Sequence, residues 1–210
     1  LEGLNQVHVK PEIGFDFSSG LRSVVRQDPD VIMVGEIRDR ETCQIAMQAS
    51  LTGHLVFSTV HTNDAPSAFT RLLDLGVEEF LLNAALVSII AQRLARRLCS
   101  NCAAPAPDSE ILFEEYHLSA LTKRFGLTDW KLMCANGCEE CANTGYVGRL
   151  AIIEYLRCDE QLRAIPKDDQ FLINAKAHNR SRGCRDLIED GLLKALQGMT
   201  TIEEVYRVCG

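Results

Sequence analysis

Four cysteines with a paired spacing are the residues of this sequence best suited to bind a metal ion. Cys99 and Cys102 form one C-x-x-C pair, Cys138 and Cys141 form a second, and residues 103–137 separate the two pairs. Each pair can present two thiolates to one tetrahedral Zn²⁺ ion, which favours soft anionic ligands. Four thiolates leave no open position for water chemistry, so the spacing predicts a structural zinc site.

Other interpretations of the cysteines remain open. The four could be unrelated buried residues or a redox site, and Cys134 lies near enough to Cys138 to replace a ligand, although the two-residue gap is missing. Clustered cysteines without a secretory signal more often hold metal than form disulfides, which indicates a reducing compartment and favours the cytoplasm. The remaining cysteines are interpreted as small core residues: Cys43, Cys158, Cys184 and Cys209.

A carboxylate, Glu36, follows a short apolar run. The run Val31–Val34 is flanked by Asp30 and Gly35, which predicts a strand buried on both faces. Ligands of open α/β sheets bind beyond the carboxyl ends of the strands. Glu36 could there hold a Mg²⁺-bound water or orient the water that attacks a nucleoside triphosphate. A strand that ends in a solvated salt-bridge loop is the alternative.

Two histidines bracket a second apolar run, Leu55–Val60. His54 stands at its entrance, and His61 stands near its exit, where it could sense a γ-phosphate beside the first carboxylate. Histidines at strand ends are also commonly structural groups that only make hydrogen bonds. Arginines near these runs could neutralise phosphate charge, although solvated or salt-bridged arginines are the usual case: Arg22, Arg26 and Arg38.

The elements that must position these residues alternate along the first half of the chain. Short apolar runs and helical patterns over residues 1–98 predict an α/β layer with a largely parallel sheet. A helix is predicted over residues 41–51, between the two strands. Asp64 is predicted to cap a helix that stops at Gly76, and a further helix is predicted over residues 78–97.

A proline-rich stretch, residues 101–107, interrupts this pattern and favours a boundary near Cys99. The remainder is predicted to be mostly helical, with one helix ending at Gly198 and a capping box, Thr201–Glu204, opening the last helix. The expected parts are an α/β core (residues 1–98), a tetracysteine subdomain (residues 99–149) and a C-terminal helical subdomain (residues 150–210).

Composition narrows the class of protein. The 210 residues are 46% apolar and 24% charged, which is typical of a folded globular chain. The formal net charge of −7 disfavours a general nucleic-acid binder, because phosphate neutralisation requires an excess of basic residues. The densest apolar stretch, Phe80–Leu94, is too short and too polar to span a bilayer, so no transmembrane segment is expected.

The run Val25–Asp39 closely resembles the signature of the type II secretion and type IV pilus ATPases. Thr52–Asp64 resembles the histidine box of that family, and Gln92–Cys99 with Thr144–Arg149 resemble the flanks of its zinc subdomain. This resemblance implies that Glu36 is the Walker B glutamate and acts in catalysis with His61. The nucleotide-binding residues that it implies are Arg22, Arg26, Arg38, His54 and Arg149.

The same resemblance implies a RecA-like P-loop NTPase core that uses ATP and Mg²⁺, a structural Zn²⁺ ion and a homo-hexamer. It implies a cytoplasmic protein, held peripherally at the inner membrane by platform proteins, whose ATP hydrolysis drives pseudopilus assembly and protein export. Type II secretion is favoured over type IV pilus assembly by the run Leu1–Val7. The tetracysteine element favours assembly and secretion motors over pilus-retraction motors.

The sequence departs from the family at one motif. It contains no G-x-x-x-x-G-K-[ST] phosphate loop and begins at Leu1 rather than Met, so we expect a truncated chain that cannot hydrolyse ATP alone. Two other classes stay open. A zinc-ribbon interaction or nucleic-acid module would explain the cysteines but not Glu36, and a standalone enzyme with a catalytic zinc is disfavoured by four thiolates.

Overall fold

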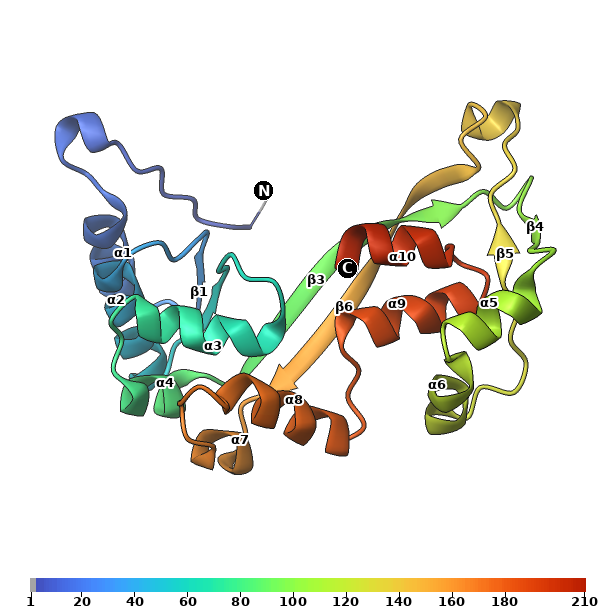
Figure 1. Cartoon of the computed structure of the whole chain (residues 1–210). Coiled ribbons are helices and arrows are strands. Elements are labelled where there is room, and N and C mark those ends of the chain that lie inside the picture. Colours follow the sequence, from blue (N-terminus) through green and yellow to red (C-terminus); the bar gives the residue numbers. More distant parts are fainter. Residues whose placement is uncertain (1–2) are drawn as a thin grey trace. The chain divides into compact units, whose positions relative to one another are not determined.

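The computed structural model describes residues 3–210, which fold into two compact units (Figure 1). Unit 1 comprises the residues up to Ile89 together with Arg157–Ala175, and unit 2 comprises Ile90–Leu156 and Lys176–Gly210. Strands β3 (Ser88–Leu98) and β6 (Tyr146–Arg157) and helix α8 (Phe171–Ser181) contribute residues to both units.

Unit 1 is built around two parallel strands. Strands β1 (Val31–Val34) and β2 (Leu55–Ser58) pair in register from Val31 opposite Leu55 to Val34 opposite Ser58. Helix α2 (Arg40–Leu51) connects them, so the predicted strand–helix–strand unit and the α/β class are confirmed. The other elements of this unit are η1 (Pro11–Ile13), α1 (Phe17–Val25), α3 (Ala65–Asp74), α4 (Glu79–Ala85) and α7 (Glu160–Ala164).

The predicted burial of strand β1 on both faces is wrong. Ile32 and Val34 are 3% and 2% exposed, but Val31 and Met33 are 54% and 66% exposed. Helices α1 and α2 contact this two-stranded sheet, and among the described residues the side chains on its other face remain exposed. Buried and exposed side chains therefore alternate along strand β1, as in a sheet that is covered on one face.

Helix α3 follows the sequence prediction closely. The Asp64 side chain accepts a hydrogen bond from the Ser67 N–H at 2.9 Å and so caps the first turn. A proline stands in that first turn, where its missing N–H is tolerated. Gly76 has a φ of +83° directly after the helix, which a residue with a Cβ rarely adopts. Start and stop are therefore determined by local chemistry.

The predicted helix over residues 78–97 is wrong beyond its first two turns. Helix α4 ends at Ala85, and the chain continues as strand β3, which pairs with strand β6. Within β3 the side chains of Ala91 and Ala95 are buried, whereas those of Ile90 and Leu94 are exposed. This two-residue alternation is selected by a partner strand far along the chain, which overrides local helix propensity.

Side chains from later in the chain bond to backbone groups of strands β3 and β6 in unit 2. The Asp190 carboxylate accepts from the Ile153 N–H at 2.9 Å, and the Asn179 amide donates to the Tyr155 carbonyl at 2.9 Å. On strand β3, the Glu204 carboxylate accepts from the Arg96 N–H at 2.8 Å. Backbone groups that are bonded to side chains in this way cannot pair with another strand.

The two C-terminal helices α9 (Leu187–Leu196) and α10 (Ile202–Cys209) confirm the prediction for this region. Thr201 caps α10 by accepting from the Glu204 N–H at 3.2 Å. The expected capping box is incomplete, because the Glu204 carboxylate bonds to Arg96 and Arg207. Unit 2 also contains β4 (Ala104–Pro105), α5 (Ser109–Glu115), α6 (Leu118–Phe125), β5 (Met133–Cys134) and η2 (Glu139–Cys141).

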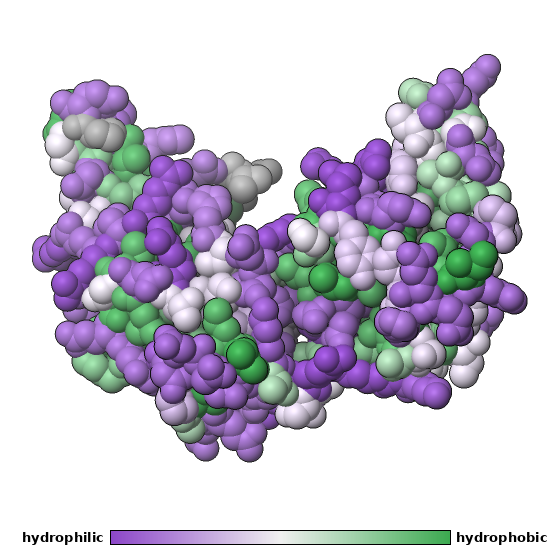
Figure 2. Space-filling model, viewed as in Figure 1, coloured by the Kyte–Doolittle hydropathy of each residue, from purple (hydrophilic) through white to green (hydrophobic). Residues whose placement is uncertain are grey.

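Exposed apolar side chains do not merge into one continuous surface on the face seen in Figure 2, where hydrophobic residues lie as separate patches among hydrophilic ones. Between residues 3 and 210, no helix combines the length and the hydropathy that crossing a membrane requires.

Candidate functional site

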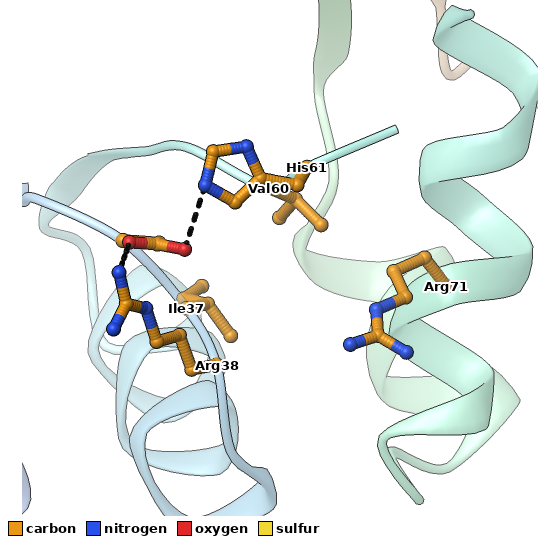
Figure 3. A pocket seen from close by; sticks show the side chains of 6 residues that line it. Ile37, Arg38, Val60, His61 and Arg71 are labelled. Atoms are coloured by element: carbon orange, nitrogen blue, oxygen red, sulfur yellow. Dashed lines mark ion pairs between the residues drawn. The ribbon is translucent and has the colours of Figure 1, made fainter. Parts of the chain in front are cut away.

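Glu36 lies directly beyond strand β1 and contacts two basic side chains (Figure 3). Its Oε1 is 2.9 Å from Nε2 of His61, and its Oε2 is 2.7 Å from a terminal nitrogen of Arg38. The Glu36 side chain is 22% exposed, whereas those of Arg38 and His61 are 77% and 87% exposed. The carboxylate is thus partly sheltered, whereas its two basic partners are open to solvent.

The backbone beyond the two strands brings these groups together. The Ile37 N–H donates to the Thr59 carbonyl at 3.0 Å, which extends the pairing of β1 and β2 past their ends. Asp39 then caps helix α2 by accepting from the Thr42 N–H at 2.8 Å. The loop that bears Glu36 is therefore fastened on one side to the neighbouring strand and on the other to a helix.

The charges around Glu36 keep it ionised. The hydrogen bond from Arg38 is the largest influence and lowers the pKa of Glu36, burial opposes it, and the charges of Arg38 and His61 lower it further. The carboxylate raises the pKa of Arg38 in return. An ionised carboxylate with an unprotonated oxygen suits a role in binding Mg²⁺-bound water or orienting a water.

An open pocket of about 350 Å³ surrounds this group. Besides Glu36 and its two partners, its lining consists of Ile37, Val60 and Arg71. Arg71 comes from helix α3 and faces the loop residues across the pocket (Figure 3). The sequence analysis did not identify Arg71. The pattern that could have indicated it is a basic residue on the polar face of the helix that follows His61.

The structure does not bring the other predicted nucleotide residues into this pocket. Arg22 pairs with Glu41, and Arg26 is exposed at the end of helix α1. His54 precedes strand β2, at the opposite end from Glu36, and its Nδ1 is 2.9 Å from the Ala49 carbonyl oxygen. Arg149 is an exposed residue of strand β6 and belongs to unit 2.

The four predicted cysteine ligands meet in unit 2. The Sγ atoms of Cys99, Cys102, Cys138 and Cys141 all lie within 4.8 Å of one another. Tetrahedral Zn–S bonds of about 2.3 Å require sulfur atoms about 3.8 Å apart. The distances are 3.9 Å between Cys99 and Cys138 and 3.8 Å between Cys102 and Cys141. The donor set therefore matches the ligand type and the approximate spacing of a four-thiolate zinc site.

Cys134 lies outside this cluster. Its thiol donates to the Ala104 carbonyl at 3.4 Å and to the Asn136 side chain at 3.6 Å. It belongs to the short strand β5, which pairs with β4. This position agrees with the sequence analysis, which preferred the four paired cysteines to Cys134 as metal ligands.

Backbone N–H groups point at the sulfurs of the cluster. Gly137 N–H donates to the Cys102 sulfur at 3.3 Å, and Gly145 N–H donates to the Cys141 sulfur at 3.2 Å. Burial disfavours ionisation of Cys141, but the N–H groups of Cys138 and Gly145 outweigh it and lower the pKa to about 6. Burial raises the pKa of Cys102 to about 12. Neighbouring thiolates repel, so full ionisation of all four requires a cation.

Glycine is required at Gly137 and Gly145 for close backbone approach. A Cβ on Gly137 would lie 2.9 Å from the Asn143 carbonyl oxygen, and one on Gly145 would lie 2.6 Å from the Ala135 Cβ. Both glycines have positive φ values, +104° and +76°. The loops that carry the cysteine pairs depend on these two residues.

The chain is similar to bacterial proteins of secretion and pilus assembly. Residues 1–207 match the family model described as "Type II/IV secretion system protein". The chain is 46% identical over 211 residues to the type IV pilus assembly ATPase PilB of Thermus thermophilus, covering 98% of this chain and 23% of that protein. It is 46% identical over 209 residues to the type II secretion system protein E of Pectobacterium carotovorum, covering 99% of this chain and 40% of that protein.

Among solved structures, the ATPase DotB of Yersinia pseudotuberculosis shares the fold. The TM-score is 0.63 at 18% sequence identity, and the match covers 99% of this chain and 45% of that chain. The chain therefore spans less than half the length of each of these proteins.

Proposed function

Because the chain belongs to the type II/IV secretion system protein family, we propose that it forms part of a hexameric motor ATPase, here called the parent protein. The proposal rests chiefly on the Glu36 carboxylate, 2.9 Å from His61 at the carboxyl end of a parallel strand. That edge of an α/β sheet is where ligands bind. Because the chain spans only part of its relatives, ATP hydrolysis is proposed for the parent protein.

Each pocket residue receives a role that its chemistry supports. Glu36 orients the attacking water or a Mg²⁺-bound water, and His61 reports the γ-phosphate to it. Arg38 and Arg71, on opposite sides of the pocket, neutralise phosphate charge. The sequence contains no G-x-x-x-x-G-K-[ST] motif, so the phosphate loop is supplied by other residues of the parent protein.

The remaining predicted nucleotide residues receive roles outside this pocket. Arg22, Arg26 and Arg149 are exposed, and we assign them to nucleotide contacts at the boundary between neighbouring subunits of the hexamer. We assign His54 to nucleotide binding as well, with its ring held at the Ala49 carbonyl of helix α2.

Two processes could use the energy of ATP hydrolysis, and we favour the first. ATP hydrolysis drives pseudopilus assembly and protein export in type II secretion, and type IV pilus assembly is the alternative. Relatives with either name are equally similar at 46% identity. The preference rests on the run Leu1–Val7, of which Leu1 and Glu2 lie outside the described residues.

The cysteine cluster is proposed to hold a structural zinc ion in a subdomain formed by residues 99–149, between a RecA-like core (residues 1–98) and a helical subdomain (residues 150–210). The parent protein works on the cytoplasmic face of the inner membrane through platform proteins. A zinc-ribbon interaction module would explain the cluster, but it gives no reason for the pocket around Glu36.

The test is steady-state ATP hydrolysis by the parent protein beside its Glu36→Gln and Glu203→Gln variants. Both variants remove one carboxylate charge, but Glu203 is an exposed residue of helix α10 and lies outside the pocket. Loss of turnover in Glu36→Gln alone, with zinc content unchanged in all three proteins, supports the proposal. Equal turnover in all three would show that Glu36 is structural.

A further inference from the structure

Thr59 joins the backbone segments that carry Glu36 and His61. Its hydroxyl donates to the Gly35 carbonyl at 2.6 Å, and its own carbonyl accepts from the Ile37 N–H at 3.0 Å. These two bonds lie on either side of Glu36 in the chain. They hold the peptide groups before and after that residue against the end of strand β2.

Gly35 lies in loosely packed surroundings. The residue is exposed, and a Cβ at this position would meet nothing closer than the Phe17 ring at 3.9 Å. Glycine also has more backbone freedom than any other residue. Without a bond to its carbonyl, Gly35 would let the Glu36 carboxylate change direction.

The ion pairs of Glu36 are poorly suited to hold it in place. Arg38 and His61 have side chains that are 77% and 87% exposed. An ion pair with an exposed partner contributes little, because water competes for that partner and its side chain loses freedom. Such pairs set the charge of the carboxylate more than they set its position.

We infer that Thr59 is a positioning residue for the Glu36 carboxylate, acting through the bond from its hydroxyl to the Gly35 carbonyl. This inference rests on the proposed ATPase function of the same site. Thr59 itself does not touch the nucleotide. It keeps the carboxylate directed at the water, so its loss lowers turnover and leaves nucleotide affinity nearly unchanged.

Three substitutions in the parent protein separate the hydroxyl from the rest of the side chain. Thr59→Val removes the hydroxyl at nearly constant volume and keeps the backbone bond to Ile37, and Thr59→Ser keeps the hydroxyl. Thr122→Val is the matched control, since it removes a hydroxyl that donates to the Ser119 carbonyl at 3.1 Å in unit 2.

We expect Thr59→Val to lower kcat about tenfold with KM for ATP within about twofold of the original protein. Thr59→Ser restores kcat, and Thr122→Val leaves it unchanged. A kcat for Thr59→Val equal to that of the original protein, or a failure of Thr59→Ser to restore it, overturns the inference. Glu36→Gln, measured beside them, reports on the function itself. If it retains turnover, the ATPase site is wrong, whereas if it alone loses turnover, only the role of Thr59 is wrong.

Discussion

Oε1 of Glu36 lies 2.9 Å from Nε2 of His61, although the two residues belong to different loops. The parallel register of β1 and β2 produces this approach, because the strands end side by side at Val34 and Ser58. A carboxylate and an imidazole at this distance can share a proton or together bind a water. The first prediction concerns this pair.

Replacing His61 by Ala in the parent protein is expected to lower ATP turnover by about 10- to 100-fold, because the group that senses the phosphate is removed from the carboxylate. His8→Ala is the matched control, since His8 is exposed and lies outside the pocket. Initial rates of phosphate release at saturating ATP give the comparison. Equal rates for the two variants would contradict the role of His61.

The second prediction concerns the cysteine cluster. Cys102→Ser is expected to lose bound zinc and to lower the melting temperature, because structural zinc binding contributes directly to folding stability. Cys134→Ser removes a thiol outside the cluster and is expected to keep the metal. Zinc content and melting curves of both variants provide the check. Full zinc occupancy in Cys102→Ser would rule out the proposed ligand set.

The third prediction follows from the buried carboxylate of Glu204. Burial disfavours its charge, but hydrogen bonds from Arg207 and Arg96 outweigh burial and lower the pKa from 4.5 to about 2. A lowered carboxyl pKa stabilises the fold above the ordinary value of 4.5. This contribution, up to about 3 kcal/mol, is lost as the pH falls from about 5 toward 2.

Glu204→Gln should therefore lower the free energy of unfolding at pH 7 and flatten its dependence on pH below about 5. Glu203→Gln is the control, because Glu203 is the exposed neighbour on the same helix. Urea unfolding of both variants at pH 7 and pH 4 measures the difference. A Glu204→Gln protein with the pH dependence of the control would show that the buried carboxylate gains no stability from its arginine partners.

Local chemistry explains which elements could be predicted from the sequence. The cap formed by Asp64 and the stop at Gly76 depend on residues within one or two turns of the helix ends, and both are confirmed. Strand β3 depends instead on strand β6, which begins at Tyr146. No short window of sequence contains that partner, so the apolar residues after Ala85 were misassigned to a helix.

In the candidate site, too, features set by nearby residues could be predicted, whereas features set by packing could not. Cys99 and Cys138 could be placed in one cluster because paired spacing restricts the geometry of their loops. The proximity of Glu36 to His61 could be expected from the ends of two neighbouring strands. Arg71 enters the pocket from a helix, and its direction depends on how that helix packs, which periodicity alone does not specify.

The identity of the nucleotide retained by the Glu36→Gln variant of the parent protein shows most directly whether Glu36 acts in hydrolysis. Protein incubated with Mg²⁺ and ATP is passed rapidly through a desalting column, and the bound nucleotide is extracted and separated. If Glu36 acts in hydrolysis and not in binding, the variant retains ATP, whereas the original protein retains ADP. Retention of ADP by the variant in the same proportion as the original protein would contradict the account.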